Sequence, residues 1–444
     1  MLRAAVTMTL CLIASGAARA QQTAAEAAAA ARAAQPTAAG ASPAAPQAAP
    51  AQPAPRENPT APSATSPTHL GANSNANANL DTNSNLDANV IGAGSPAVAA
   101  PGGLASASEK PAHAIELSAY AILNGAWTQS DPQLVTVGRN NGFALGDARI
   151  ELTGRPADTL WLYLSIDGAA PLKGDDPVAG RRTVELRDAY GVWAPSQHLR
   201  IQAGQFKAPQ DVEELLEETE LKFASRSIVT NGLSAPFGYD APGLGLDRQL
   251  GLGLGTDRVD LGGLGLIAQI ALMNGNGANQ LLNDTQYPSA VGRVALDLLG
   301  RALTIGVDGY FQPRGTGTQP TYFRDNLFGA GADLRYERGP FHAMLLAQVR
   351  STHHVTSHAP DELSLGFSAE TAGRFGFVEP ALRVSYLDPT SQVATDAITA
   401  ATLGLNLYAP NAPARLTLDF THRIEQSGRS LDNDGLELSA QVRF

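Results

Sequence analysis

From residue 115 onward, the sequence alternates between apolar and polar residues with a period of two. In one segment the apolar Leu162, Leu164 and Ile166 alternate with Tyr163 and Ser165. Successive side chains of a β-strand point to opposite sides, so this pattern predicts strands with one apolar and one polar face. About sixteen such segments occur, each close to the 9–11 residues with which a tilted strand crosses a membrane. They lie near 115–127, 143–154, 160–168, 183–193, 199–206, 248–255, 264–274, 290–298, 303–311, 327–336, 341–349, 362–372, 377–387, 399–408, 414–424 and 435–444. The fourth is the weakest, because its alternation changes phase around Asp188.

The gaps between these segments alternate between short and long. Short gaps include 155–159, 194–198, 337–340 and 409–413, and long gaps include 128–141, 207–247, 275–289 and 312–325. Outer-membrane barrels have short periplasmic turns and long outer loops. No stretch after the first residues is apolar enough for a spanning helix, and a closed barrel is the other membrane architecture. The sequence therefore predicts an all-β fold, a transmembrane antiparallel β-barrel over 114–444. A soluble exported enzyme is the alternative class.

The last predicted strand ends on an aromatic residue. Leu436, Leu438, Ala440, Val442 and Phe444 alternate with polar residues. This resembles the C-terminal strand by which outer-membrane barrels are recognised for assembly. We therefore expect the outer-membrane assembly machinery and outer-membrane lipid to be partners.

The first residues have the pattern of a secretory signal peptide. Arg3 precedes a short apolar run over residues 4–14, and Ala18 and Ala20 occupy the two positions that a signal peptidase reads. We expect residues 1–20 to be cleaved before Gln21, and Cys11, the single cysteine, to be removed with them. Residues 21–113 are rich in Ala, Pro and Asn and poor in large apolar residues, which predicts a disordered periplasmic tether.

The net charge of −11 belongs to the predicted barrel. The acidic and basic residues of 1–113 cancel, so the excess of carboxylates lies in 114–444. Nucleic-acid binding needs a basic face, so we expect no nucleic-acid partner.

Several segments resemble the porin O/P family, the phosphate-selective porin-like outer-membrane porins. The most specific is Gly204-Gln205-Phe206-Lys207-Ala208-Pro209. Weaker similarities occur, in family order, at 143–150, 248–251, 273–277, 378–383 and 403–408. The resemblance covers about 115–444 and implies a sixteen-stranded barrel, usually a homotrimer. It also implies that the third outer loop folds inward as a constriction.

The longest gap, 207–247, is the third outer loop in this chain. Asp211 followed by Glu214 has the spacing of a capping box, and Val212, Leu215, Leu216 and Thr219 then recur at helical spacing. We expect a short amphipathic helix whose apolar edge packs on the inner barrel wall; a helix lying on the outer rim is the alternative. The predicted constriction residues are Lys207, Glu213, Glu214, Glu217, Glu218, Glu220, Lys222 and Arg226.

Basic residues are also predicted to face the lumen from the wall. They are Arg200, Arg293, Arg335, Arg350, Arg383, Arg415 and Arg423. The third outer loop holds eight acidic residues against three basic ones, whereas rings of Arg and Lys select anions and carboxylates select cations. The sequence therefore predicts passive diffusion of ions and small hydrophilic solutes with a mild preference for cations. The alternatives are a phosphate- or anion-selective porin and a non-conducting barrel that acts as an anchor or adhesin.

No motif indicates catalysis, a cofactor or a metal. His353, His354 and His358 lie close together in the sequence, but we interpret them as solvated loop residues. No G-x-S-x-G motif is present, so we expect no enzyme. A barrel lipase whose triad is assembled in space is the alternative.

Overall fold

In a computed structural model of the protein, the described residues are 114–171, 182–239, 241–280, 282–316, 322–357, 359–426 and 430–444. The predicted signal peptide and tether, residues 1–113, lie outside them, and so does His358.

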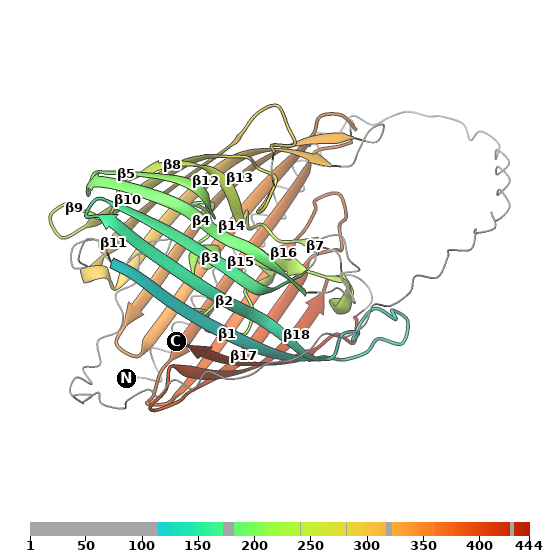
Figure 1. Cartoon of the computed structure of the whole chain (residues 1–444). Coiled ribbons are helices and arrows are strands. Elements are labelled where there is room, and N and C mark those ends of the chain that lie inside the picture. Colours follow the sequence, from blue (N-terminus) through green and yellow to red (C-terminus); the bar gives the residue numbers. More distant parts are fainter. Residues whose placement is uncertain are drawn as a thin grey trace, which may run out of the picture. The chain divides into compact units, whose positions relative to one another are not determined.

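Sixteen strands form one closed antiparallel sheet (Figure 1). Each pairs with the next along the chain, and β1 also pairs with β19, which leaves no open edge. They are β1 (Ala114–Thr128), β2 (Gly142–Ala157), β3 (Leu160–Pro171), β4 (Arg182–Ser196), β5 (Leu199–Lys207), β8 (Arg248–Gly255), β10 (Gly265–Met273), β11 (Ser289–Leu298), β12 (Leu303–Thr316), β13 (Phe323–Arg338), β14 (Phe341–His354), β15 (Glu362–Gly373), β16 (Val378–Asp388), β17 (Ile398–Tyr408), β18 (Ala414–Glu425) and β19 (Gly435–Arg443). The predicted sixteen-stranded β-barrel is confirmed.

The remaining elements are short. β9 (Val259–Asp260) pairs with β10 beside the end of β8. Between β5 and β8 lie α2 (Val212–Leu215), α3 (Ile228–Asn231), β6 (Gly232–Leu233), η1 (Ala235–Phe237) and β7 (Ala241–Pro242), and η2 (Leu299–Arg301) joins β11 to β12. Within the described ranges, no helix has the length and apolar character needed to cross a membrane.

The apolar faces of the strands point away from the barrel interior. On β3, Leu162 and Leu164 are 53% and 37% exposed, whereas Trp161, just before them, and Ser165, just after them, are 3% and 0% exposed. Many of the side chains buried inside are charged, among them Arg149 and Arg248. This arrangement is the reverse of a soluble barrel, in which the apolar side chains fill the interior.

A β-bulge accounts for the phase change in the fourth strand. Ser165 of β3 pairs with Asp188 of β4, but the next residue, Ile166, pairs with Leu186. Arg187 is therefore an extra residue in β4, and the alternation reverses across it.

A glycine in β5 permits the close approach of β4. Gly204 has φ +130, and a Cβ at this position would lie 2.1 Å from the carbonyl oxygen of Ala189. We therefore expect Gly204→Ala to lower the free energy of unfolding by about 1–3 kcal/mol, measured by urea titration of the purified barrel. Gly253→Ala on β8 is the matched control, since its Cβ would meet its nearest neighbour at an ordinary 3.4 Å. Equal stability of the two variants would contradict this interpretation.

Candidate pore constriction

The segment 208–247, which connects β5 to β8, packs on the inner wall of the barrel. Its buried apolar residues Val212, Leu216, Ile228, Val229 and Leu244 belong to one cluster with residues of β14, β16 and β17. The wall residues of this cluster are Met344, Leu346, Leu387, Ile398 and Ala400. Burial of these side chains is the main force that holds the segment against the wall.

Three of the predicted wall arginines bind the main chain of this segment. Arg350 donates to the Gly243 carbonyl oxygen at 2.9 Å, Arg383 to that of Ser225 at 2.8 Å, and Arg415 to that of Leu221 at 2.6 Å. Leu221, Ser225 and Gly243 lie outside the helices and strands, and the guanidinium groups supply hydrogen-bond donors to their carbonyl oxygens. The arginines of β14, β16 and β18 therefore fix the segment in place.

The other four predicted wall arginines have different partners. Arg200 lies 3.5 Å from Asp257, Arg293 forms ion pairs with Asp333 and Asp308, and Arg335 lies 2.7 Å from Glu337. Arg423 donates to the Asn433 carbonyl oxygen at 2.6 Å and covers the ring of Phe237. Carboxylates thus offset the charge of Arg200, Arg293 and Arg335.

The helix of the segment is shorter than predicted. Asp211 caps it as expected, accepting hydrogen bonds from the main-chain N–H groups of Glu213 and Glu214, but α2 ends after one turn. The Lys207 ammonium and the Arg226 guanidinium donate to the carbonyl oxygen of Leu216 at 2.7 and 2.8 Å. These cations take the place of the next helical N–H donors, so the prediction of a helix continuing to Thr219 is wrong.

Glu213 is buried inside the segment rather than facing an open lumen. It is 1% exposed, and its carboxylate accepts from the Ser227 N–H at 2.8 Å, the Ser227 hydroxyl at 2.5 Å and the Thr230 hydroxyl at 2.7 Å. Arg383 approaches it at 3.5 Å. Glu213 therefore links α2 to the start of α3 and to the wall.

Asp211 shares Thr230 with Glu213. The Thr230 oxygen lies 2.7 Å from a carboxyl oxygen of each residue, yet it carries a single proton. Burial and the charges of Glu213 and Glu214 raise the pKa of Asp211 to about 8. A proton on Asp211 lets this carboxyl donate to Thr230 while Thr230 donates to Glu213, which satisfies all three groups.

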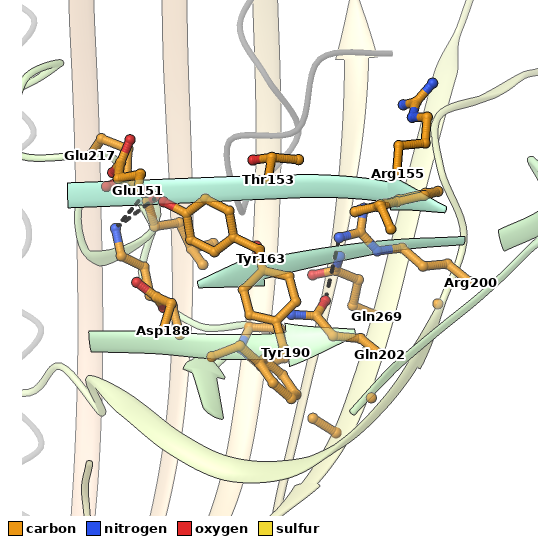
Figure 2. A pocket seen from close by; sticks show the side chains of 18 of the residues that line it. Glu151, Thr153, Arg155, Tyr163, Asp188, Tyr190, Arg200, Gln202, Glu217 and Gln269 are labelled. Atoms are coloured by element: carbon orange, nitrogen blue, oxygen red, sulfur yellow. Dashed lines mark hydrogen bonds and ion pairs between the residues drawn. The ribbon is translucent and has the colours of Figure 1, made fainter. Parts of the chain in front are cut away.

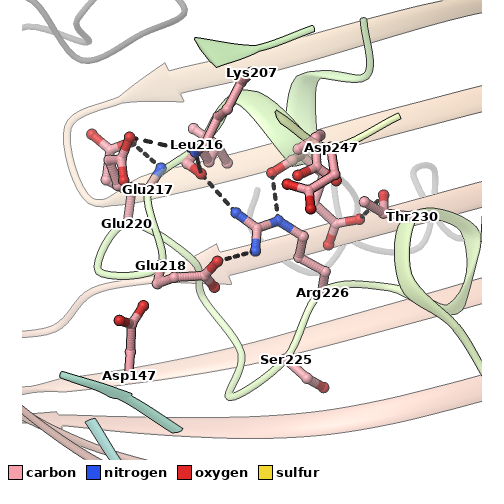
Figure 3. A network of polar contacts seen from close by, with 12 residues as sticks. Asp147, Lys207, Leu216, Glu217, Glu218, Glu220, Ser225, Arg226, Thr230 and Asp247 are labelled. Atoms are coloured by element: carbon pink, nitrogen blue, oxygen red, sulfur yellow. Dashed lines mark hydrogen bonds and ion pairs between the residues drawn. The ribbon is translucent and has the colours of Figure 1, made fainter. Parts of the chain in front are cut away.

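Glu217 and Glu218 lie in a network of cations (Figure 3). Glu217 is 3.4 Å from Lys207 and 3.3 Å from Arg149 of β2, and Glu218 pairs with Arg226. Burial alone would raise the pKa of Glu217, but Lys207, Arg248 and Arg149 together lower it to about 2. For Glu218, Arg226 likewise outweighs burial and lowers the pKa to about 2. Both carboxylates therefore stay ionised at neutral pH.

The remaining predicted constriction residues are less central. Glu220 is exposed and accepts a hydrogen bond from the Glu217 N–H at 3.1 Å, and Lys222 lies 3.5 Å from Glu379 of β16. Glu214 is buried, and burial raises its pKa.

Two cavities meet at this segment. One, of about 230 Å³, lies at the short-turn end of the barrel and is lined by Glu217 together with Arg200 and Glu151. The other, of about 770 Å³, lies toward the long connections and is lined by Glu218 and Arg226 together with Asp147 of β2. Because Glu217 and Glu218 are adjacent yet line different cavities, the segment lies between the two. Glu213, Glu220 and Lys222 line neither of these cavities.

Several solved structures share this fold. OmpT of Vibrio cholerae, an outer membrane protein in its trimer form, has a TM-score of 0.50 at 9% identity, covering 75% of this chain and 100% of its own. The outer membrane channel DcaP of Acinetobacter baumannii has a TM-score of 0.50 at 11% identity, covering 75% and 98%. OmpF of Salmonella typhi, in complex with daunomycin, has a TM-score of 0.50 at 14% identity, covering 75% and 98%. No protein-family profile and no curated protein sequence matches the chain.

The chain has the fold of outer-membrane porins. These structures share the barrel at low identity, so membership of the porin O/P family stays a prediction.

The role of the charged residues of β2, β4 and β8 that face the segment 208–247 was not predicted from the sequence. Arg149 is 1% exposed and joins Asp147, at 2.8 Å, to Glu217. Arg248 holds both carboxylate oxygens of Asp188, at 3.0 and 2.9 Å. One signal was available for β2, where Asp147, Arg149 and Glu151 occupy alternate positions and so share the inner face.

His353 and His354 are the last two residues of β14, so the prediction that they lie in a loop is wrong, and both pair with carboxylates. His353 lies 2.8 Å from Asp361, and His354 lies 2.8 Å from Asp325 and 3.4 Å from Glu362. In the part of the chain that the structure describes, no group of three His, Cys, Asp or Glu residues is arranged to hold a metal ion.

Proposed function

We propose that this protein is an outer-membrane porin through which ions and small hydrophilic solutes diffuse passively. The observation that carries the proposal is a closed sixteen-stranded barrel with an apolar exterior and a charged interior crossed by the segment 208–247. Barrels of this strand number leave an aqueous channel. The fold shared with a protein described as an outer membrane channel is consistent with it. The protein needs no catalytic group or cofactor for this function.

Location and assembly follow from the same proposal. The exposed apolar band would contact outer-membrane lipid, and the tail before residue 114 would be periplasmic, on the side of the short turns. A homotrimer is the proposed assembly, since the family resemblance implies one and the solved structure of OmpT is described as a trimer. On the basis of the sequence resemblance, we propose that the chain belongs to the porin O/P family.

The narrowest point is proposed to lie between Glu217, Glu218 and Arg226 on the segment and Asp147 and Arg149 on β2. Glu213 belongs to the anchoring of the segment, whereas Glu217 and Glu218 border the two cavities. The cations Lys207, Arg149 and Arg226 offset much of the glutamate charge. A weak preference for cations results, supported by the net charge of −11.

An anion-selective porin is the second candidate. Arg350 and Arg415 line the cavity of about 770 Å³ and donate to main-chain carbonyls. Arg293 is instead paired with the carboxylate of Asp333, so its positive charge is offset more strongly than theirs. A pore that preferred anions and was blocked by low concentrations of phosphate would favour this candidate.

The double variant Glu217→Gln/Glu218→Gln is expected to shift the reversal potential in a salt gradient toward anion selectivity. We expect the cation-to-anion permeability ratio to fall about two- to fivefold, as loss of about 0.5–1 kcal/mol of interaction in a water-filled site would give. The shift should fade near molar salt, because ions screen the charges. Asp260→Asn/Asp361→Asn removes two exposed carboxylates away from the cavities and is the matched control. An unchanged reversal potential in the first variant would place the constriction elsewhere.

Liposome swelling tests the proposed function. Liposomes that contain the purified barrel should admit small sugars and amino acids at rates that fall with solute size. An anchor or adhesin would admit none of them, and ester hydrolysis by the same preparation would favour an enzyme.

A further inference from the structure

The cavity at the short-turn end of the barrel has an aromatic wall (Figure 2). We call this cavity the aromatic vestibule; its aromatic wall consists of Trp161, Tyr163, Tyr190 and Phe206. The rings of Tyr163 and Tyr190 lie 5.3 Å apart at 36°, and those of Tyr190 and Phe206 lie 6.1 Å apart. Trp161, Tyr190 and Phe206 are buried, whereas Tyr163 is partly exposed and presents its ring to the cavity.

Several polar groups around this wall have no hydrogen-bond partner among the described residues. Thr153, Tyr163 and Gln269 line the vestibule (Figure 2). The hydroxyls of Thr153 and Tyr163 and the side-chain amide of Gln269 make no hydrogen bond to the described residues. The Gln202 amide oxygen accepts from Arg200 at 3.4 Å, which leaves its NH2 group available. Donors and acceptors that have no protein partner are those that a ligand can satisfy.

The charges of the vestibule balance. Its acidic lining residues are Glu116, Glu151, Asp188 and Glu217, and its basic ones are Arg155, Arg200, Lys207 and Arg443. Asp188 is held by Arg248, and Glu217 by Lys207 and Arg149. With no net formal charge, the site favours neither cations nor anions.

The aromatic faces are not all available to a cation. The guanidinium groups of Arg155 and Arg200 lie over the Trp161 ring, 5.9 and 5.7 Å from its centroid. A quaternary ammonium ligand needs such a face and would be repelled by these two groups. The chemistry that remains is a neutral ring with an apolar face and several hydroxyl groups.

We propose that the aromatic vestibule binds a single neutral polyhydroxylated ring of the size of a hexose. The carbon face of the ring packs on Tyr163, while its hydroxyls pair with Thr153, Tyr163, Gln202 and Gln269. The cavity volume of about 230 Å³ is below the roughly 300–1,000 Å³ usual for drug-sized ligands and suits one ring. The proposal deepens the porin function and rests on it, because the vestibule would lie on the solute path.

Tryptophan fluorescence tests the binding directly. The chain has three tryptophans, and Trp127 and Trp193 are 38% and 47% exposed on the barrel, so Trp127→Phe/Trp193→Phe leaves Trp161 as a reporter in the vestibule. Glucose is expected to change its emission saturably. Added to this background, Tyr163→Phe should weaken the apparent affinity about two- to tenfold, the usual effect of one lost hydrogen bond.

Tyr310→Phe is the matched control. Its buried hydroxyl has no hydrogen-bond partner in the part of the chain that the structure describes, and Tyr310 does not line the vestibule, so glucose affinity should not change. No saturable response to glucose, or equal affinities in the two tyrosine variants, would overturn the proposal. So would a saturable response to choline or benzoate in its place.

Channel recordings distinguish failure of the vestibule from failure of the pore. Glucose is expected to add open-channel current noise that Tyr163→Phe reduces and Tyr310→Phe does not. A conducting barrel without this noise and without the fluorescence response would refute the sugar site and leave the porin function intact. A fluorescence response in a barrel that never conducts would instead refute the porin function.

Discussion

Replacing Glu213 by alanine is expected to release the segment 208–247 from the barrel wall. The change removes the acceptor of Ser227 and Thr230 and leaves Arg383 without its buried carboxylate. Breaking a buried charge pair by removing one partner costs about 3–5 kcal/mol. We therefore expect a fall of that size in the stability of the segment, seen as faster proteolysis within 208–247 and a larger, noisier single-channel conductance.

The matched control is Glu220→Ala, which removes an exposed glutamate from the same segment. It should leave both proteolysis and conductance close to those of the wild type. If Glu213→Ala also behaved as the wild type, the segment would be held by its apolar cluster alone, and the anchoring role of Glu213 would be wrong.

Replacing Arg248 by alanine is expected to destabilise the barrel itself. Arg248 is 1% exposed and binds both oxygens of Asp188, joining β8 to β4 across β5. Its removal leaves the buried carboxylate of Asp188 without its cation, at a cost of about 3–5 kcal/mol. The free energy of unfolding, measured by urea titration in detergent or lipid, should fall by this amount.

The double variant Arg248→Leu/Asp188→Leu separates the charge from the packing. Replacing both members of a buried ion pair by apolar residues is often close to neutral, so most of the lost stability should return. A double variant as unstable as Arg248→Ala would mean that shape, and not an unpaired charge, causes the loss.

The barrel could be predicted from the sequence because lipid imposes a simple pattern. Each strand must present apolar side chains outward at every second position and pair its main chain with neighbours, and the alternating lengths of the gaps follow from that topology. Even the irregularity around Asp188 was visible, since the bulge at Arg187 shifts the phase of the alternation.

The details of the constriction could not be predicted, because its partners lie far apart in the sequence. Arg350 binds a carbonyl 107 residues away, and Arg415 one that is 194 residues away. Helical spacing predicted that the helix continues past Leu216. In the structure, Lys207 and Arg226 donate to the Leu216 carbonyl oxygen, which would accept from a main-chain N–H group if the helix continued. A local pattern does not reveal which long-range cation competes with a helix.

The vestibule was missed for a related reason. Its aromatic residues come from β3, β4 and β5. The alternation along each strand predicts that these side chains face the interior, but it does not predict which of them contact one another. That the rings of Tyr163 and Tyr190 meet depends on the register between the two strands, in which Tyr163 pairs directly with Tyr190.

Single-channel recording in a planar lipid bilayer tests the central claim most directly. Purified wild-type protein, shown to be folded as a barrel, should insert and give stable, stepwise increases of current with a uniform conductance and a weak preference for cations at low salt. A correctly folded barrel that inserts but gives no steps would contradict the account and favour a non-conducting anchor or adhesin.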